Sequence, residues 1–192
     1  MKRLVPIVAL LLTAGPALAH VGHGPAASFT SGLGHPLGGL DHVAAMVAVG
    51  LWAALKGGRA LWVWPSAFVG VMLAGGALGM AHLPLPFVEP GILASVVVLG
   101  LLVALAIDLP VGTGAIIIAS FALLHGYAHG SEVEESAHGA AYMAGFALAT
   151  AALHLAGIGF AQTMKHLALR PAVRLAGAAC VLAGIASFTG AL

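Results

Sequence analysis

Charge is the property that this chain has least of. Of its 192 residues only 7% are charged, whereas 61% are hydrophobic, and the mean hydropathy is +1.08. A soluble domain carries roughly 25% charged residues, so the composition excludes an ordinary soluble enzyme. The formal net charge of +1 leaves no field that would attract a nucleic acid. The composition therefore predicts an integral membrane protein that is surrounded by lipid.

Cysteine is almost absent as well. The single Cys180 excludes an internal disulfide, so any part outside the membrane must fold without one. Glycine is plentiful, at 27 residues, and its use without a collagen period is typical of closely packed transmembrane helices. Histidine is the residue in unexplained excess, because its 10 copies outnumber the seven lysines and arginines together.

Residues 1–19 have the pattern of a cleavable signal peptide. Lys2 and Arg3 precede an apolar run at 4–12, and small residues at 17–19 supply a cleavage site. An uncleaved span is the alternative, but the run is shorter than the roughly 20 residues that cross a bilayer. Cleavage would leave residues 20–33 as a periplasmic segment, whose His20 and His23 either capture metal or form a solvated tail.

Six later stretches are long and apolar enough to cross a membrane. They are residues 34–55, 61–81, 90–107, 112–129, 137–161 and 172–192. Unpaired backbone groups are too costly in lipid for open strands, so all six are expected to be helices. Short connections predict that consecutive helices are antiparallel neighbours. We therefore expect an all-α integral membrane protein, with one six-helix transmembrane domain at residues 34–192.

The two halves of this domain hold three spans each. That count is compatible with a 3+3 inverted repeat, although coincidence is the other interpretation. The basic residues of the mature chain all fall in alternate loops on one side: Lys56, Arg59, Lys165, Arg170 and Arg174. The positive-inside rule then predicts a multi-pass protein of the bacterial inner membrane with a periplasmic N-terminus. Trp52, Trp62 and Trp64 near the inner ends predict an aromatic belt.

The first span opens with a histidine motif, His-Pro-Leu-Gly-Gly-Leu-Asp-His, at residues 35–42. On a continuous helix His35 and His42 would share nearly one face, with Asp41 beside His42. Pro36 is acceptable in a first turn. The two glycines that follow weaken the helix and permit either close packing or an unwound stretch that lines a cavity.

The fourth span ends with a second motif, in which His125 and His129 are spaced i, i+4 and Glu132 follows. These three side chains can line one stripe of a helix. The first span starts outside and the fourth ends outside, so both motifs are expected at one depth. The candidate metal ligands are therefore His35, Asp41, His42, His125, His129 and Glu132.

Imidazole nitrogens with one or two carboxylates suit divalent nickel, cobalt, zinc or copper. Asp41 in an apolar helix needs either such a cation or a hydrogen-bond partner, for which His42 would serve. A single histidine would more simply cap a helix or lie in headgroup water, but two motifs on one side favour a site. His154, deep in the fifth span, is expected to be either a ligand on the ion path or an interhelical hydrogen-bond group.

With these two motifs the sequence resembles the HupE/UreJ family of nickel and cobalt permeases. The resembling segments are residues 35–42 with Met46 and 50–52, and residues 121–132. The resemblance implies that Ni²⁺ or Co²⁺ is imported as the substrate, with a link to hydrogenase or urease maturation. It also implies that the six candidate ligands are needed for transport. Residues 43–45 depart from the expected pattern, where a bulkier residue would follow the Asp-His pair.

The chain has no GxxxxGK[ST] loop for a nucleotide, so uptake without ATP hydrolysis is expected. The expected protein is not an enzyme and has no organic cofactor. An intramembrane zinc-dependent hydrolase is the alternative, with three histidines on zinc and Asp41 or Glu132 as general base. A metal sensor without flux is a third interpretation.

Overall fold

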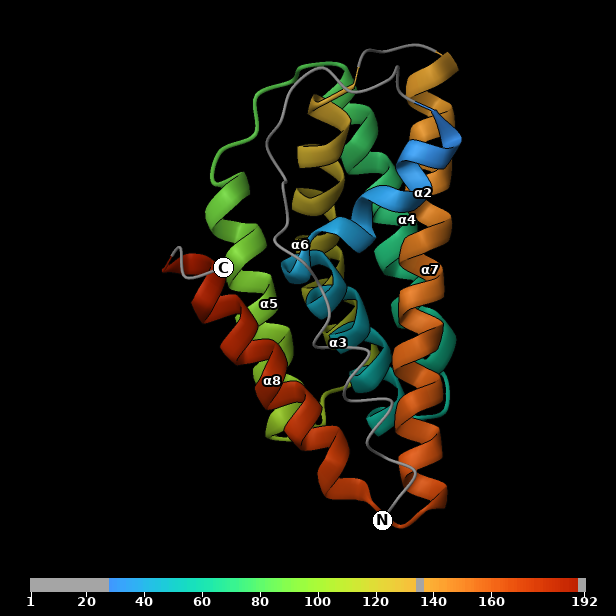
Figure 1. The fold of residues 1–192 in the computed structure, drawn as a ribbon, viewed down its shortest axis with the longest axis vertical. Helices are drawn as coiled ribbons and strands as arrows, with labels where there is room; N and C mark the ends of the chain where they lie inside the picture. Colours follow the sequence, from blue (N-terminus) through green and yellow to red (C-terminus); the bar gives the residue numbers. More distant parts are fainter. Residues whose placement is uncertain (1–27, 134–136, 190–192) are drawn as a thin grey trace.

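The structure is a computed structural model that describes residues 28–133 and 137–189. Within these residues the chain forms seven helices and no strand, which confirms the all-α class (Figure 1). The helices are α2 (Phe29–Gly38), α3 (Leu40–Lys56), α4 (Ala60–Met80), α5 (Val88–Ala104), α6 (Val111–Ser131), α7 (Ala137–His166) and α8 (Arg170–Phe188). The predicted signal peptide, His20 and His23 lie outside the described residues.

Several of these helices are long and apolar enough to cross a membrane. They are α4, α6, α7 and α8, and the pair α2 and α3 meets the same criteria as one span bent by 88°. Helix α5 is apolar but has only 17 residues. The helices thus fit a multi-pass membrane protein with four or five candidate spans, while the six-helix count and the 3+3 repeat stay predictions.

The first span expected at 34–55 is broken into two helices at Gly39, where the two glycines permitted an unwound stretch. Helix α2 begins at Phe29, where the Ser28 hydroxyl accepts a hydrogen bond from the Ser31 N–H, and it ends at Gly38. Gly39 is extended, and α3 starts in a new direction at Leu40. Pro36 lies near the end of α2 rather than in a first turn. A proline followed by two glycines disfavours continuation of the helix, which explains the break.

Helix α3 is the centre of the bundle. Its residues 44–46 and 48–53 are buried, and it packs against α4, α5, α7 and α8. A helix that is apolar on all sides is expected to be enclosed by others. In Figure 1, α7 lies on one side of α3, and the pair α5 and α8 lies on the other.

The most extensive packing joins helices that are not consecutive: α4 with α6, α5 with α8, and both α2 and α3 with α7. The expectation that sequence neighbours pack together is therefore wrong for the largest contacts. Glycines explain the tightest of them. A Cβ at Gly75 or Gly79 of α4 would overlap the backbone of α6 at Leu123 or Tyr127. Small residues let these two backbones touch.

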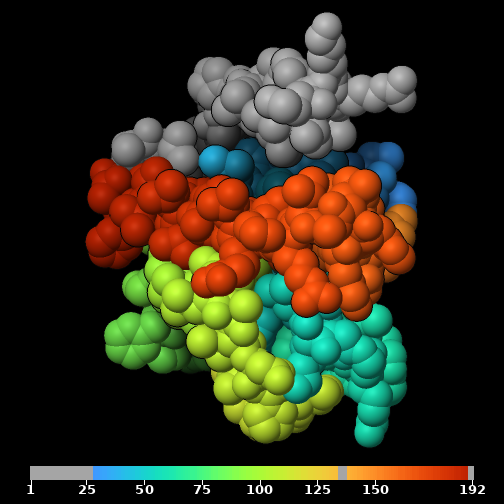
Figure 2. Space-filling model, turned by 90° about the horizontal axis from the view of Figure 1, so that it is seen from below, coloured from blue at the N-terminus to red at the C-terminus, as the bar shows by residue number. Residues whose placement is uncertain are grey.

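All five lysines and arginines of the described residues lie in or near the segments that join α3 to α4 and α7 to α8. Figure 2 views the molecule from below, toward the end where α3, α5 and α7 finish. Lys56 forms an ion pair with Asp108 at 2.5 Å, and Arg174 Nε donates a hydrogen bond to the Ala104 carbonyl at 2.8 Å. The basic residues therefore cluster on one face, as the topology predicted.

The aromatic belt is wrong for two of its three tryptophans. Trp52 and Trp64 are fully buried, and their ring centroids lie 4.2 Å apart. Their indole N–H groups donate to the carbonyls of Ile107 and Val111. Only Trp62 is exposed. The buried pair therefore links α3 to the connection after α5, and α4 to the first residue of α6.

The contact between α4 and α6 predicts that alanine is destabilising at one glycine of α4 and not at another. Gly75→Ala should lower the free energy of unfolding by about 1–3 kcal/mol, because its Cβ meets backbone that cannot rotate away. Gly70→Ala is the matched control, since the space beside Gly70 is open. Thermal unfolding of the purified chain in detergent measures both. Equal melting temperatures for the two variants would contradict the packing.

Candidate metal site

Asp41 and His42 form a carboxylate–imidazole pair in the first turn of α3. Asp41 Oδ1 accepts a hydrogen bond from the His42 backbone N–H at 2.9 Å and lies 3.0 Å from His42 Nδ1. A carboxylate only accepts hydrogen bonds, so Nδ1 carries the proton and Nε2 keeps its lone pair. The expectation that His42 satisfies Asp41 is confirmed by this contact.

His129 of α6 faces this pair from the opposite side. Its Nε2 lies 2.6 Å from His42 Nε2, and its Nδ1 lies 3.5 Å from Glu132 Oε2. Each imidazole thus has a carboxylate on its Nδ1 side and turns Nε2 toward the other ring. A carboxylate behind the imidazole is the usual support of a metal-ligating histidine. At 2.6 Å the two Nε2 atoms form a hydrogen bond, and His129 Nε2 is its donor because His42 Nε2 is unprotonated. A cation bound between the two rings would replace this proton.

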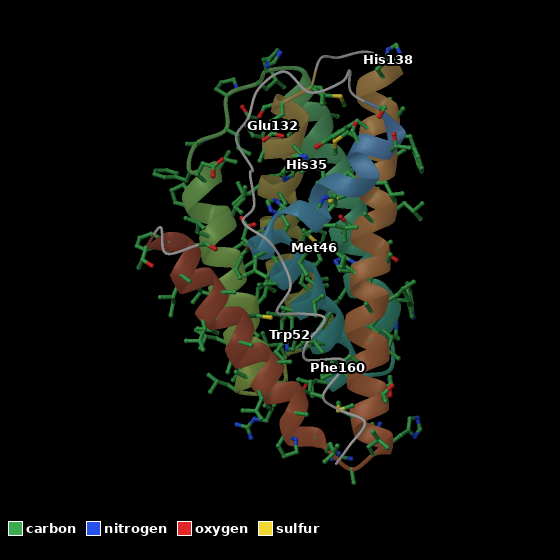
Figure 3. The ribbon with its side chains drawn as sticks, viewed as in Figure 1. His35, Met46, Trp52, Glu132, His138 and Phe160 are labelled. Carbon is green, nitrogen blue, oxygen red and sulfur yellow. The ribbon has the colours of Figure 1, made fainter. Side chains whose placement is uncertain are left out.

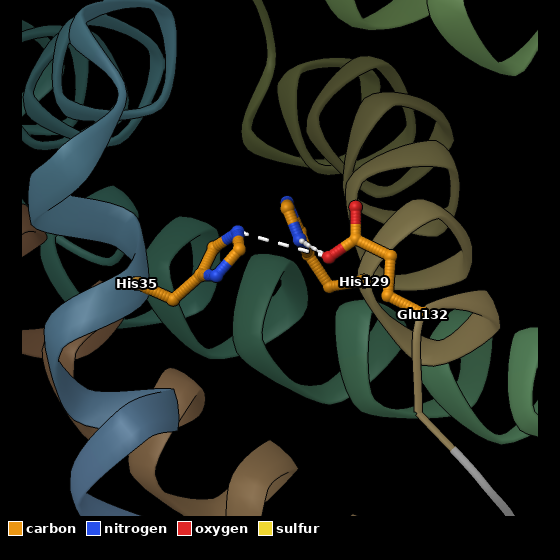
Figure 4. Close-up of side chains that lie close together, drawn as sticks. All are labelled: His35, His129 and Glu132. Atoms are coloured by element: carbon orange, nitrogen blue, oxygen red, sulfur yellow. Dashed lines mark ion pairs between the residues drawn. The ribbon is translucent and has the colours of Figure 1, made fainter. Parts of the chain in front are cut away.

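His35 completes the outer part of the cluster from α2 (Figure 3). Its ring centroid lies 4.6 Å from that of His129, and its Nε2 lies 3.8 Å from Glu132 Oε2. One ligand atom from each of His35, His129 and Glu132 falls within 4.8 Å of the others (Figure 4). Such a group of nitrogen and oxygen donors could hold a divalent transition metal.

Glu132 caps the end of α6 and is the most exposed member, with 55% of its side chain accessible. Partial burial acts to raise the pKa of its carboxyl, but the contact with His129 and the nearby imidazoles outweighs this. The pKa of Glu132 therefore lies below its ordinary value, and the group is a carboxylate at neutral pH. Its negative charge is available to a cation that arrives from solvent.

His125 lies one turn deeper on α6 and is fully buried. Its Nε2 lies 2.8 Å from the Ser95 hydroxyl of α5, and that hydroxyl donates its single proton to the Ile92 carbonyl at 2.6 Å. Ser95 must then accept from His125, so Nε2 carries the proton. His125 Nδ1 keeps its lone pair and has no hydrogen-bond partner among the described residues. The ring lies 5.1 Å from that of His42.

The structure thus brings all six predicted ligand residues into one connected cluster. One detail of the prediction is wrong: His35 and His42 do not share a face of one helix, because α2 and α3 meet at 88°. The bend places both rings against His129 instead, with 4.6 Å between centroids in each case.

His154 does not join the cluster. It lies deeper on α7 and is fully buried, and neither ring nitrogen has a hydrogen-bond partner among the residues described. The interhelical hydrogen bond that was one of its two expected roles is therefore missing from this part of the chain. Its closest ring neighbour is Phe68 of α4, at 5.1 Å between centroids.

Three residues of the cluster's surroundings were not found from the sequence. Ser95 supports His125, while Tyr142 and Phe146 of α7 form the wall beside His35 and His129. The ring of Phe146 lies 4.5 Å from that of His129. The sequence does contain a pattern that indicates this wall. Tyr142, Phe146, Thr150 and His154 recur at four-residue spacing, which places them on one face of a helix.

Comparison with known proteins identifies the family of the chain. The family described as "HupE / UreJ protein" matches residues 8–187, a range that includes both histidine motifs. "Protein HupE" of Rhizobium leguminosarum bv. viciae is 46% identical over 176 residues, which cover 91% of this chain and 92% of that protein. No solved structure matches the chain. Because the family match and the relative each cover nearly the whole sequence, the chain belongs to the HupE/UreJ family.

Proposed function

We propose that the protein is a permease that imports Ni²⁺ or Co²⁺ across the bacterial inner membrane without ATP hydrolysis. The observation that carries the proposal is the pair of imidazoles, His42 and His129, whose Nε2 atoms face each other with carboxylates behind them. Family membership favours a permease over the zinc hydrolase that the sequence left open.

In this proposal the ion arrives at the exposed Glu132 and His35 and exchanges part of its water for their side chains. It then passes to His42 and His129, which Asp41 and Glu132 orient, and to Nδ1 of His125. The end of the bundle with this cluster faces the periplasm, and the basic end faces the cytoplasm. The domain comprises residues 34–192, after a cleaved signal peptide at 1–19 and a periplasmic segment at 20–33. The imported metal supplies hydrogenase or urease maturation.

The site predicts a loss of uptake when His42, or the carboxylate of Asp41 that orients it, is removed. His42→Ala and Asp41→Ala should each lower the initial rate of radiolabelled Ni²⁺ uptake at least about tenfold, because the metal loses a ligand or its oriented partner. His138→Ala is the matched control, since His138 lies exposed at the same end of the bundle, outside the cluster (Figure 3). Undiminished uptake in both cluster variants would contradict the site.

Ser95 predicts a positioning effect. Ser95→Ala should weaken Ni²⁺ binding and uptake about tenfold, because His125 loses the acceptor that fixes its protonated nitrogen. Ser95→Thr keeps a hydroxyl and should retain both. Ser120→Ala is the matched control, because this exposed serine of α6 bonds only the Ile116 carbonyl. A purely packing role for Ser95 would leave the Ni²⁺ affinity of Ser95→Ala unchanged.

The absence of ATP from the proposal predicts a response to membrane potential. A divalent cation gains about 4.6 kcal/mol per 100 mV of inside-negative potential, which is twice the value for one charge. Ni²⁺ uptake into proteoliposomes without nucleotide should therefore accelerate when a potassium gradient with valinomycin makes the interior negative. Vesicles with the His42→Ala chain are the control. A rate that ignores the potential would contradict electrogenic uptake.

A further inference from the structure

The faces of α4 and α7 that meet inside the bundle carry buried side chains at regular four-residue spacing, which we call the ladder. On α7 the residues Tyr142, Phe146, Thr150 and His154 follow one another every fourth position, and all are buried. On α4 the residues Phe68 and Met72 are also four apart and fully buried. Residues at this spacing lie on one face of a helix.

Two contacts fix how the faces meet. The Thr150 hydroxyl donates to the Met72 sulfur at 3.7 Å, and the rings of His154 and Phe68 lie 5.1 Å apart. The two helices are therefore antiparallel here: moving four residues forward on α7, from Thr150 to His154, corresponds to moving four residues back on α4, from Met72 to Phe68. The ladder starts at the outer cluster, where Phe146 contacts His129, and ends at His154, about 12 Å deeper along α7.

His154 is out of place in this interior unless it has a ligand. Its side chain is fully buried and neither nitrogen is paired within the described residues, whereas buried polar groups are normally hydrogen-bonded. An ionisable side chain within a membrane span is a functional group by default. Phe68 contacts both His125 and His154, at 5.9 and 5.1 Å between ring centroids. His154 thus lies next along the path from the deepest residue of the cluster.

We propose that His154 is a second metal-binding position, which receives the ion from His125 on its way inward. The inference rests on the proposed permease function. The Met72 thioether and the Thr150 hydroxyl lie one turn outward and supply sulfur and oxygen donors during the transfer. The imidazole of His154 suits a late divalent transition metal such as Ni²⁺, whereas Mg²⁺ and Ca²⁺ prefer sites made of oxygen ligands.

The first test separates binding at the outer cluster from transfer. His154→Leu fills similar space without a donor, so Ni²⁺ binding to the purified full chain should stay within about twofold, while flux into proteoliposomes falls at least about tenfold. His166→Leu is the matched control, because His166 lies on the same helix at its exposed end. Unchanged flux in His154→Leu would overturn the second position.

A second test reads the position directly and needs no transport. In His154→Cys, saturating Co²⁺ should produce a thiolate-to-cobalt absorption band in the near ultraviolet, and Ni²⁺ flux should be partly retained. The unsubstituted chain should lack the band, because Cys180 is directed at the Ala44 carbonyl. Absence of the band in His154→Cys would overturn the proposal. Absence of flux in the unsubstituted chain would instead overturn the permease function, and the band would still report on the position.

Discussion

The bend at Gly39 is the feature on which the rest of the site depends. On a continuous helix His35 and His42 would be separated by about 10 Å along the axis. The 88° change of direction instead sets both rings 4.6 Å from the ring of His129. The extended backbone at Gly39 is open to any residue, so glycine is needed there for space. A Cβ would meet Asp41 Oδ1 and His42 Nδ1, and would separate the pair that orients the imidazole.

Buried polar groups in an apolar bundle need hydrogen-bond or charge partners, and residues of the cluster act as partners for one another. Asp41 satisfies His42, Glu132 approaches His129, and Ser95 satisfies His125. Asp41 and Ser95 each occupy one ring nitrogen of their histidine, whereas His129 Nδ1 lies 3.5 Å from Glu132 without a hydrogen bond among the described residues. The supports come from α3, α6 and α5, so the packing of three helices sets the direction of the lone pairs. The helix packing that stabilises the bundle therefore also fixes the orientation of these ring nitrogens.

The sequence predicts the helical class, the basic end and the meeting of the two motifs, because each depends on local composition or on which end of a helix a residue occupies. Pro36, Gly38 and Gly39 permit the break that the structure shows, but the shared face of His35 and His42 is wrong because their spacing places them together only on a continuous helix. Ser95 could not be found, since a lone serine in an apolar helix looks the same whether it bonds a histidine or its own backbone. Trp52 and Trp64 were misassigned for a similar reason: a tryptophan near a helix end can turn its N–H to headgroups or to carbonyls.

The two ends of the bundle differ in a way that matters for a carrier. At one end Glu132 and His35 are exposed by 55% and 40% of their side chains, so the cluster is reached from solvent. Toward the basic end Trp52 and Trp64 are fully buried, and their indole N–H groups donate to the carbonyls of Ile107 and Val111. A permease must expose its site to one side at a time. In the proposed permease, the exposed His35 and Glu132 and the buried tryptophans near the basic end fit a state that is open toward the histidine end.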